Sequence, residues 1–150
     1  MKYTITLDSK QLNIISRAID FYERVIGLGQ LEEISWMWRN NNNPRDENYE
    51  SNYFIINSAL NIIKKAGWGH DPNESHSIYS NNVPEEFKIL YDITQKIRKC
   101  VNDVEISKAK EEGDFERVRH LEMTVNNRSF MAASDNEPIE IFKNPDLTTT

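Results

Sequence analysis

The chain has 150 residues, of which 38% are hydrophobic and 28% charged, and its formal net charge at pH 7 is −6. This length is typical of a single domain with a core of its own. The acidic balance disfavours DNA, RNA and anionic membranes as partners, and we expect none of them. The single cysteine, Cys100, excludes an internal disulfide and a cysteine-based zinc finger, and is typical of a reducing compartment.

The first residues predict a short strand. Tyr3, Ile5 and Leu7 alternate with polar residues, which is the period of a strand with one buried face. No apolar stretch here resembles a signal peptide, and no run in the sequence approaches the roughly 20 apolar residues of a membrane span. We therefore expect a cytoplasmic protein.

A helix is predicted to begin after Asp8 and Ser9, which suit a helix N-cap. Two adjacent apolar stripes follow, formed by Leu12, Ile15, Ile19, Tyr22 and Ile26 and by Ile14, Ala18, Phe21, Val25 and Leu28. Such a pattern predicts a helix buried over a broad arc at the centre of the fold. Gly27 and Gly29 interrupt it, since each costs about 1 kcal/mol in a helix interior. The interruption predicts either a kinked helix or two helices that meet at a tight corner.

Two further long helices are predicted, over residues 46–66 and 84–103. The asparagine-rich residues 39–45 are expected to form a loop before the helix at 46–66, and Gly67 is expected to end that helix. The helix at 84–103, the third long helix of the chain, begins with Pro84, which suits the first position of a helix. Between the two helices, the polar residues 68–82 form a long connector that holds His70 and His76.

Residues 106–123 predict a helical arm that breaks at Gly113 and Asp114 and could form a dimer contact. Ile139 and Ile141 alternate with a polar residue and predict a closing strand that pairs with residues 3–7. The expected fold class is therefore mainly α (α+β), with three long helices, a short helical arm and a small antiparallel sheet from the N- and C-terminal segments. One helical domain is expected over residues 1–143, with a flexible tail over 144–150.

The sequence predicts no catalytic residue, no metal site and no cofactor. His70 and His76 do not have the spacing of a zinc signature, and Cys100 lies among apolar residues of the third long helix. Adjacent acidic pairs such as Glu32 and Glu33 point in different directions on a helix, so they do not form an acid–base couple. The sequence also contains no glycine-rich phosphate-binding loop. We expect a protein that is not an enzyme.

Several polar residues stand beside the apolar stripes, around the glycine break and on the third long helix. They allow two interpretations: a surface ladder of ion pairs, or a polar pocket between the interrupted helix and the third long helix. In a pocket, arginines would bind phosphate or carboxylate bidentately and aromatic rings would stack on a base, which suits a small nucleotide. The candidate ligand-binding residues are Arg24, Gln30, Glu33, Trp38, Arg39, His76, Tyr91, Asp92, Gln95 and Arg98.

Two segments carry a resemblance, residues 18–34 (AIDFYERVIGLGQLEEI) and residues 90–98 (LYDITQKIR). With His-Ser-Ile at 76–78, they resemble a family of small, largely uncharacterised phage and prophage proteins. Members of that family begin with a strand and a helix reading aliphatic-Tyr-x-Arg-Ile-x-x-Gly-Gln-x-x-Glu-Ile, and later carry a Tyr-Asp-x-x-Gln-x-Ile-Arg helix. The resemblance covers about residues 3–100. The motif positions that it carries onto this chain are Arg24, Gly27, Gly29, Gln30, Glu33, Tyr91, Asp92, Gln95 and Arg98.

The resemblance implies a phage-type accessory or anti-defence protein that acts in the host cytoplasm. By analogy with helical oligomers that act as sponges, we expect it to sequester a small nucleotide signal of host immunity. One alternative is a protein–protein inhibitor that uses its acidic helical surface against a host defence or regulatory protein. A second alternative is a phosphoesterase-like enzyme that uses acidic residues and His76. The expected partner is thus a small nucleotide or a host protein, and the sequence is compatible with a homo-oligomer.

Overall fold

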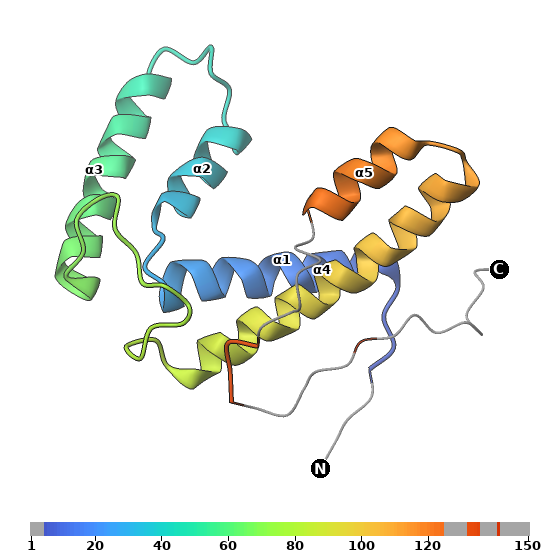
Figure 1. Cartoon of the computed structure of the whole chain (residues 1–150). Helices are drawn as coiled ribbons and strands as arrows, with labels where there is room; N and C mark the ends of the chain where they lie inside the picture. The colour runs from blue at the N-terminus through green and yellow to red at the C-terminus, as the bar shows by residue number, and fades with distance from the viewer. Residues whose placement is uncertain (1–4, 125–131, 136–140, 142–150) are drawn as a thin grey trace.

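The computed structural model describes residues 5–124, 132–135 and 141, and this part of the chain is helical (Figure 1). Its elements are α1 (Ser9–Tyr22), the π-helical turn η1 (Glu23–Gly27), α2 (Glu32–Asn41), α3 (Tyr49–Trp68), α4 (Glu85–Glu111) and α5 (Phe115–Thr124). The described residues contain no strand, so the predicted α+β class with its antiparallel sheet is wrong. None of the described helices is both long enough and apolar enough to cross a membrane.

Residues 5–7 of the expected N-terminal strand do not form one, because the described part of the chain offers no strand to pair with. Ile5 is 77% exposed, and Asp8 already caps α1 with a reciprocal capping box, in which Asp8 Oδ1 accepts from the Gln11 amide at 2.8 Å. Alternation over three apolar residues does not make a strand when no ladder satisfies its backbone groups. Ile141 is not in a strand, while Tyr3, Ile139 and the predicted tail at 144–150 lie outside the described residues.

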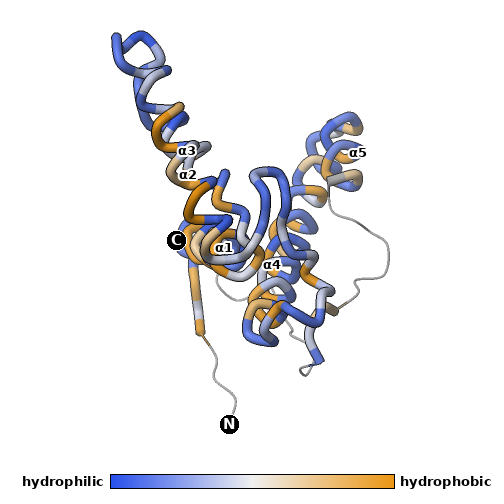
Figure 2. Tube along the Cα trace, turned by 90° about the vertical axis from the view of Figure 1, so that its left-hand side faces the viewer, coloured by the Kyte–Doolittle hydropathy of each residue, from blue (hydrophilic) through white to orange (hydrophobic). Residues whose placement is uncertain are grey.

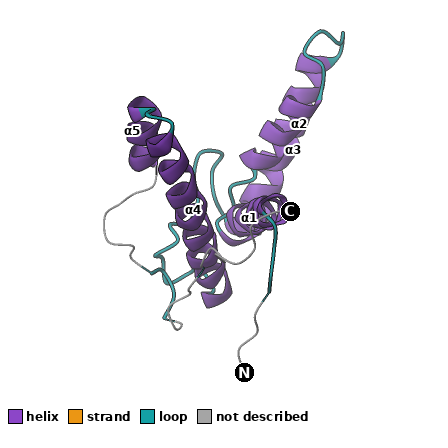
Figure 3. Cartoon of the chain, turned by 90° about the vertical axis from the view of Figure 1, so that its right-hand side faces the viewer, coloured by secondary structure: helices purple, strands orange, loops and turns teal. Residues whose placement is uncertain are grey.

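The centre of the molecule is the contact between α1 and α4, from which two helical hairpins diverge (Figures 1 and 3). The α2–α3 hairpin projects from the C-terminal end of α1, and α5 folds back along α4. The apolar core gathers where η1 and the connector before α4 meet that helix, at Leu28, Ile78, Val83 and Phe87. The arc that α1 buries is narrower than predicted, since Ile14 and Ala18 are exposed.

The glycine break is a sharp corner between α1 and α2, so the second of the two predicted alternatives is correct. A Cβ on Gly27 would lie 2.5 Å from ring atoms of Phe87, and one on Gly29 would lie 3.0 Å from the Trp68 ring. Gly29 also has a φ of +70°, which side-chain-bearing residues rarely adopt. The two glycines therefore let the corner pack directly against α4 and the end of α3.

The predicted helical arm at 106–123 consists of the last turns of α4, which continues to residue 111 and not only to the predicted 103, together with α5. The two helices break at Gly113, which has a φ of +72°, and Asp114 Oδ1 accepts from the Arg117 amide at 3.0 Å as the cap of α5. Arg117 then pairs with Glu105 at 2.5 Å across the hairpin. The predicted dimer contact of this arm stays a prediction.

Candidate functional site

A cleft of about 420 Å³ opens between the C-terminal end of α1, the η1 corner, the 75–78 segment and the middle of α4. This volume is within the range of small-molecule sites. The cleft is lined by Asp20, Glu23, Arg24, Leu28, Gln30, Ser75, His76, Ser77, Ile78, Tyr91, Gln95 and Arg98. Most of these side chains are polar or charged, and they come from segments up to 78 residues apart in the sequence.

The π-helical turn places two of the charged side chains. Glu23 and Arg24 are its first two residues, and their carbonyl oxygens accept from the amides of Leu28 and Gln30 at 3.0 and 2.9 Å. These wider hydrogen-bonded rings replace the α-helical pattern, and π-turns within helices are frequent at functional sites. The indole of Trp68 donates to the Ile26 carbonyl at 3.2 Å and ties the turn to α3.

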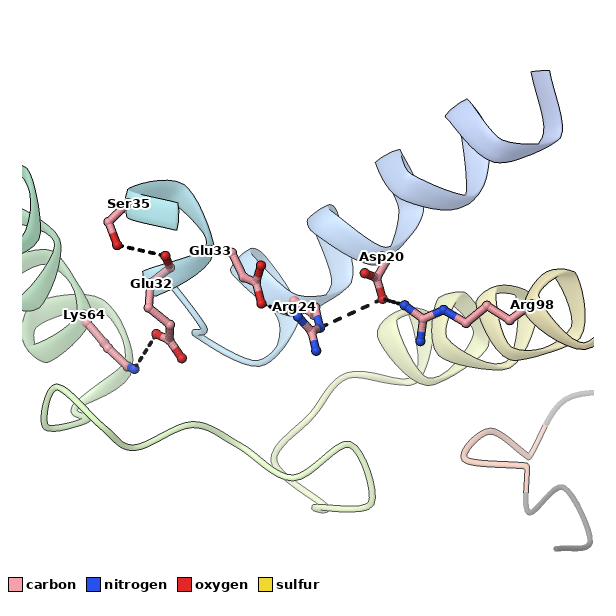
Figure 4. Close-up of polar contacts among 7 residues, drawn as sticks. All are labelled: Asp20, Arg24, Glu32, Glu33, Ser35, Lys64 and Arg98. Atoms are coloured by element: carbon pink, nitrogen blue, oxygen red, sulfur yellow. Dashed lines mark hydrogen bonds and ion pairs between the residues drawn. The ribbon is translucent and has the colours of Figure 1, made fainter. Parts of the chain in front are cut away.

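A chain of ion pairs crosses the cleft from α4 to α2 (Figure 4). Arg98 Nη2 lies 2.6 Å from Asp20 Oδ1, and Arg24 Nε lies 3.9 Å from the same oxygen. Arg24 also pairs with Glu33 at the start of α2. Asp20 thus pairs closely with Arg98 and lies at the limit of ion-pair range from Arg24, while the side chains of Arg24 and Arg98 remain 40% and 44% exposed. Each guanidinium has five donors, so both arginines keep donors for a further acceptor.

Glu23 is the most unusual acid of the cleft, because only 3% of its surface is exposed. Burial, together with the neighbouring Asp20 charge, raises the pKa of Glu23 to about 7, although Arg24 and Arg98 oppose the shift. The carboxyl group therefore changes charge near neutral pH. A cleft residue with such a pKa is a candidate for a functional role.

Tyr91 supplies the aromatic wall of the cleft on α4. Its ring meets that of Tyr79 edge-on, with 6.3 Å between the centroids. Burial and a hydrogen bond with Tyr79 raise the pKa of Tyr91 to about 12, so the phenol stays protonated and can donate a hydrogen bond. The apolar neighbours Leu28 and Ile78 are both buried.

His76 is fixed in the cleft by its backbone and by its ring. Its amide donates to the Leu28 carbonyl at 3.0 Å, which joins the connector to the corner. Its ring meets the ring of His70 edge-on at a centroid distance of 4.3 Å. The long polar connector is therefore held against the η1 corner by specific contacts.

Six of the ten residues predicted from the sequence line this one cleft, namely Arg24, Gln30, His76, Tyr91, Gln95 and Arg98. Glu33 lies beside it as the ion-pair partner of Arg24. Trp38 and Arg39 belong elsewhere, further along the α2–α3 hairpin. Trp38 stacks on Tyr49 at 5.2 Å, and the Arg39 guanidinium lies 5.1 Å from the Tyr53 ring centroid.

Asp92 serves a different contact from the one predicted. It is buried, and its carboxylate accepts from the backbone amides of Ala133 and Ser134 at 2.8 and 3.1 Å. The ladder of ion pairs, one of the two interpretations of these polar residues, runs instead from Arg98 through Asp20 to Arg24. Asp92 instead ties residues 133 and 134 to α4.

The sequence interpretation missed the two acids that lie deepest in the arrangement, Asp20 and Glu23. Their spacing could have identified them, because Asp20, Glu23 and Arg24 stand at i, i+3 and i+4 and so share a helix face. Such a cluster is also typical of an ordinary solvated face. Their role in the cleft depends on the approach of α4, which local spacing does not reveal.

Within the described residues, no three metal-ligating side chains come close enough together to hold a metal ion. Comparison of the chain with protein-family models, curated proteins and solved structures returned no match. The resemblance to phage proteins therefore stays a prediction, and the functional proposal below depends on the geometry of the cleft.

Proposed function

We propose that this protein acts by binding a small nucleotide in the cleft at the η1 corner, and that it sequesters the nucleotide unchanged. The observation that carries the proposal is the convergence of Arg24 and Arg98, from two different helices, on the single carboxylate of Asp20. In the setting that the resemblance implies, the ligand would be a nucleotide signal of host immunity and the protein a phage-type anti-defence factor.

The two arginines support a phosphate as one part of the ligand. Guanidinium groups bind phosphate bidentately, and two of them on opposite walls of one cleft can share a single phosphate or bind two neighbouring ones. Ion pairs of Arg98 with Asp20 and of Arg24 with Glu33 limit the motion of both side chains before the ligand arrives, which lowers the entropy cost of binding.

The rest of the cleft supports a base or ribose as the other part of the ligand. Tyr91 offers an aromatic ring, and Gln30 and Gln95 offer amides that both donate and accept hydrogen bonds. Stacking of a base on an aromatic ring contributes about 1–3 kcal/mol. Leu28 and Ile78 add an apolar floor of limited extent.

Thermal-shift screening of the full chain against mononucleotides, cyclic dinucleotides and ADP-ribose isomers tests the proposal. We expect at least one of these compounds to raise the melting temperature with a saturable dose dependence. Arg24→Ala and Arg98→Ala should each weaken binding roughly tenfold to a hundredfold, because each removes a charge-assisted hydrogen bond of about 1.5–3 kcal/mol.

Two arginines outside the cleft provide matched controls. Arg117 is also paired with a carboxylate, and Arg39 contacts Tyr53 on the α2–α3 hairpin. Arg117→Ala and Arg39→Ala should leave the affinity unchanged. If none of the nucleotides shifts the melting temperature, or if the control variants lose as much affinity as the cleft variants, the proposal is wrong.

Asp20→Asn is expected to raise the affinity, whereas the arginine substitutions lower it. The substitution removes the negative charge between Arg24 and Arg98 while it keeps a hydrogen-bond acceptor beside them. An anionic ligand should then bind about tenfold more tightly, since a nearby like charge opposes it in the native chain. A loss of affinity measured by calorimetry would show that Asp20 is required by the ligand and that the anion does not replace it.

A second candidate function is phosphoester hydrolysis, which is favoured by the presence of Glu23 and His76 in the same cleft. A carboxyl group with a pKa of about 7 could act as a general acid or base. Incubation of the protein with excess nucleotide, followed by denaturation and chromatography, separates the two functions. Sequestration returns the nucleotide intact, whereas hydrolysis releases a product that accumulates beyond one equivalent of protein.

A further inference from the structure

The outer face of α3 carries a second feature, which is independent of the cleft. Four large apolar side chains on this helix are mostly exposed: Phe54 by 72%, Ile55 by 62%, Ile62 by 71% and Ile63 by 52%. Together with the small residues between and around them, they form what we call the free face of α3, made of Ser51, Phe54, Ile55, Ser58, Ala59, Ile62, Ile63 and Ala66. Monomers rarely expose so many large apolar side chains along one helix.

The opposite side of α3 is already covered. Tyr49 and Lys64 are buried there, and Tyr49 and Tyr53 stack against Trp38 of α2. The helix is thus apolar around much of its circumference, a pattern typical of a helix covered on both sides. Among the described elements α3 packs chiefly against α2, and Figure 2 shows hydrophobic residues along this hairpin below its hydrophilic tip.

The free face is uncharged on an acidic protein. The chain has a net charge of −6, yet no charged residue occurs between Glu50 and Lys64. Two copies of an acidic chain repel each other over most of their surfaces. A neutral face is where they can approach without placing like charges opposite each other.

The spacing of the free face is symmetric about its midpoint and places small residues there, which suits a second, antiparallel copy as the occupant. Two large residues (54 and 55), two small ones (58 and 59) and two large ones (62 and 63) follow one another at equal intervals, with small residues again at 51 and 66. Read in either direction, the pattern is the same. A contact about a twofold axis uses the same surface on both sides, so the small residues at the midpoint of one copy would meet those of the other.

We propose that two copies of this chain associate antiparallel through the free face of α3, with Ser58 and Ala59 at the crossing point. Ile55 of each copy then lies near Ile62 of the other, while Phe54 and Ile63, about 180° apart around the helix, flank the contact at its two edges. The small residues at the centre let the two helix backbones approach closely. A contact formed mainly by one helix from each copy is at the lower end of interface sizes, below about 1,200 Å² in total, so we expect a reversible dimer of micromolar affinity.

Sedimentation equilibrium of the full chain between about 1 and 200 μM tests the proposal, since this range spans a micromolar dissociation constant. The wild-type chain should shift from monomer to dimer across this range. Ala59→Glu should remain monomeric, because it places two carboxylates opposite each other at the twofold axis. Ile14→Glu is the matched control, at a residue that is 59% exposed on α1, and it should dimerise like the wild type.

Cysteine crosslinking tests the geometry without disturbing the face. In a Cys100→Ser background, Ala59→Cys should crosslink to itself with a short bismaleimide. Ser51→Cys alone should not, but a mixture of Ser51→Cys and Ala66→Cys chains should. A wild-type chain that stays monomeric at the highest concentration overturns the proposal, as does an Ala59→Glu chain that is helical by circular dichroism and still dimerises. Efficient self-crosslinking of Ser51→Cys overturns the antiparallel arrangement.

Discussion

The cleft at the η1 corner and the free face of α3 depart from ordinary burial in opposite directions. At the corner, Glu23 is almost completely buried although it is ionisable, and Arg24 and Arg98 are held by a shared carboxylate. On α3, Phe54 and Ile62 are largely exposed although they are apolar. Burying an ionisable group and exposing a large apolar side chain both reduce the stability of the isolated chain.

The cleft and the free face of α3 also differ in the kind of partner that would stabilise them. A cleft of paired charges is relieved by a small molecule that carries charge and hydrogen-bonding groups of its own. An uncharged apolar strip is relieved by another apolar surface. The charged cleft and the exposed apolar face lie on separate elements of one short chain, because η1 and the free face of α3 share no residue.

A large loss of stability is expected from a substitution at Gly27, which packs against α4 at the corner. Gly27→Ala should lower the free energy of unfolding by about 2–3 kcal/mol, because the new methyl group would overlap the Phe87 ring. Gly67→Ala on α3 is the control, since nothing lies within 4 Å of the added Cβ and alanine favours a helix by about 1 kcal/mol. Urea denaturation of both variants measures the difference, and equal effects would contradict the close packing of the corner.

The next prediction is that Glu23 makes the free energy of unfolding depend on pH. Its folded-state pKa of about 7 exceeds the usual value of 4.5, so the folded chain binds the proton more tightly than the unfolded chain. The stability contribution is complete below about pH 4.5 and is lost as the pH rises through 7. Each unit of pKa shift corresponds to about 1.4 kcal/mol, so this loss is a few kcal/mol at most. Glu23→Gln should flatten the corresponding part of a curve of unfolding free energy against pH.

The affinity for the nucleotide should also depend on the ionisation of Glu23. Above pH 7 the ionised Glu23 adds a negative charge to the cleft and should weaken the affinity for an anionic nucleotide. Calorimetry at pH 6 and pH 8 measures this change, and Glu23→Gln should remove most of it. A pH dependence that survives in the variant would assign the titration to another group.

The smallest effect on stability is expected on the free face of α3. At concentrations where the chain is monomeric, Ile62→Ala should change the free energy of unfolding by less than about 0.5 kcal/mol, because the side chain is 71% exposed. Leu31→Ala at the corner, where the residue is 3% exposed, should cost about 2–5 kcal/mol. Thermal denaturation of dilute samples compares them, and a large loss for Ile62→Ala would mean that the face is covered within the single chain.

Local chemistry allowed much of the fold to be predicted from the sequence. Asp8 begins α1, Pro84 precedes α4, and Gly113 with Asp114 separates α4 from α5, because capping residues and glycines act within a few positions of themselves. The strand predicted at residues 3–7 is absent at its described residues, 5–7, since an alternating pattern says nothing about whether a pairing partner exists.

The candidate site was predictable to the extent that it follows helix faces. Arg24 with Gln30, and Tyr91 with Arg98, were identified because they flank apolar stripes that must pack together. Asp92 was misplaced, since its partners lie at residues 133 and 134, about 40 positions away. Trp38 was misplaced because the α2–α3 hairpin carries it away from the corner. Such long-range outcomes depend on tertiary packing that local spacing does not encode.

Arginine side-chain NMR during nucleotide titration tests the central claim most directly, because it reports on each guanidinium separately. The Nε–H signals of Arg24 and Arg98 should shift saturably as an ADP-ribose isomer or cyclic dinucleotide is added, while those of Arg39 and Arg117 should stay in place. Signals that do not move with any nucleotide of the panel, or arginine signals that all move together, would contradict a nucleotide site at the η1 corner.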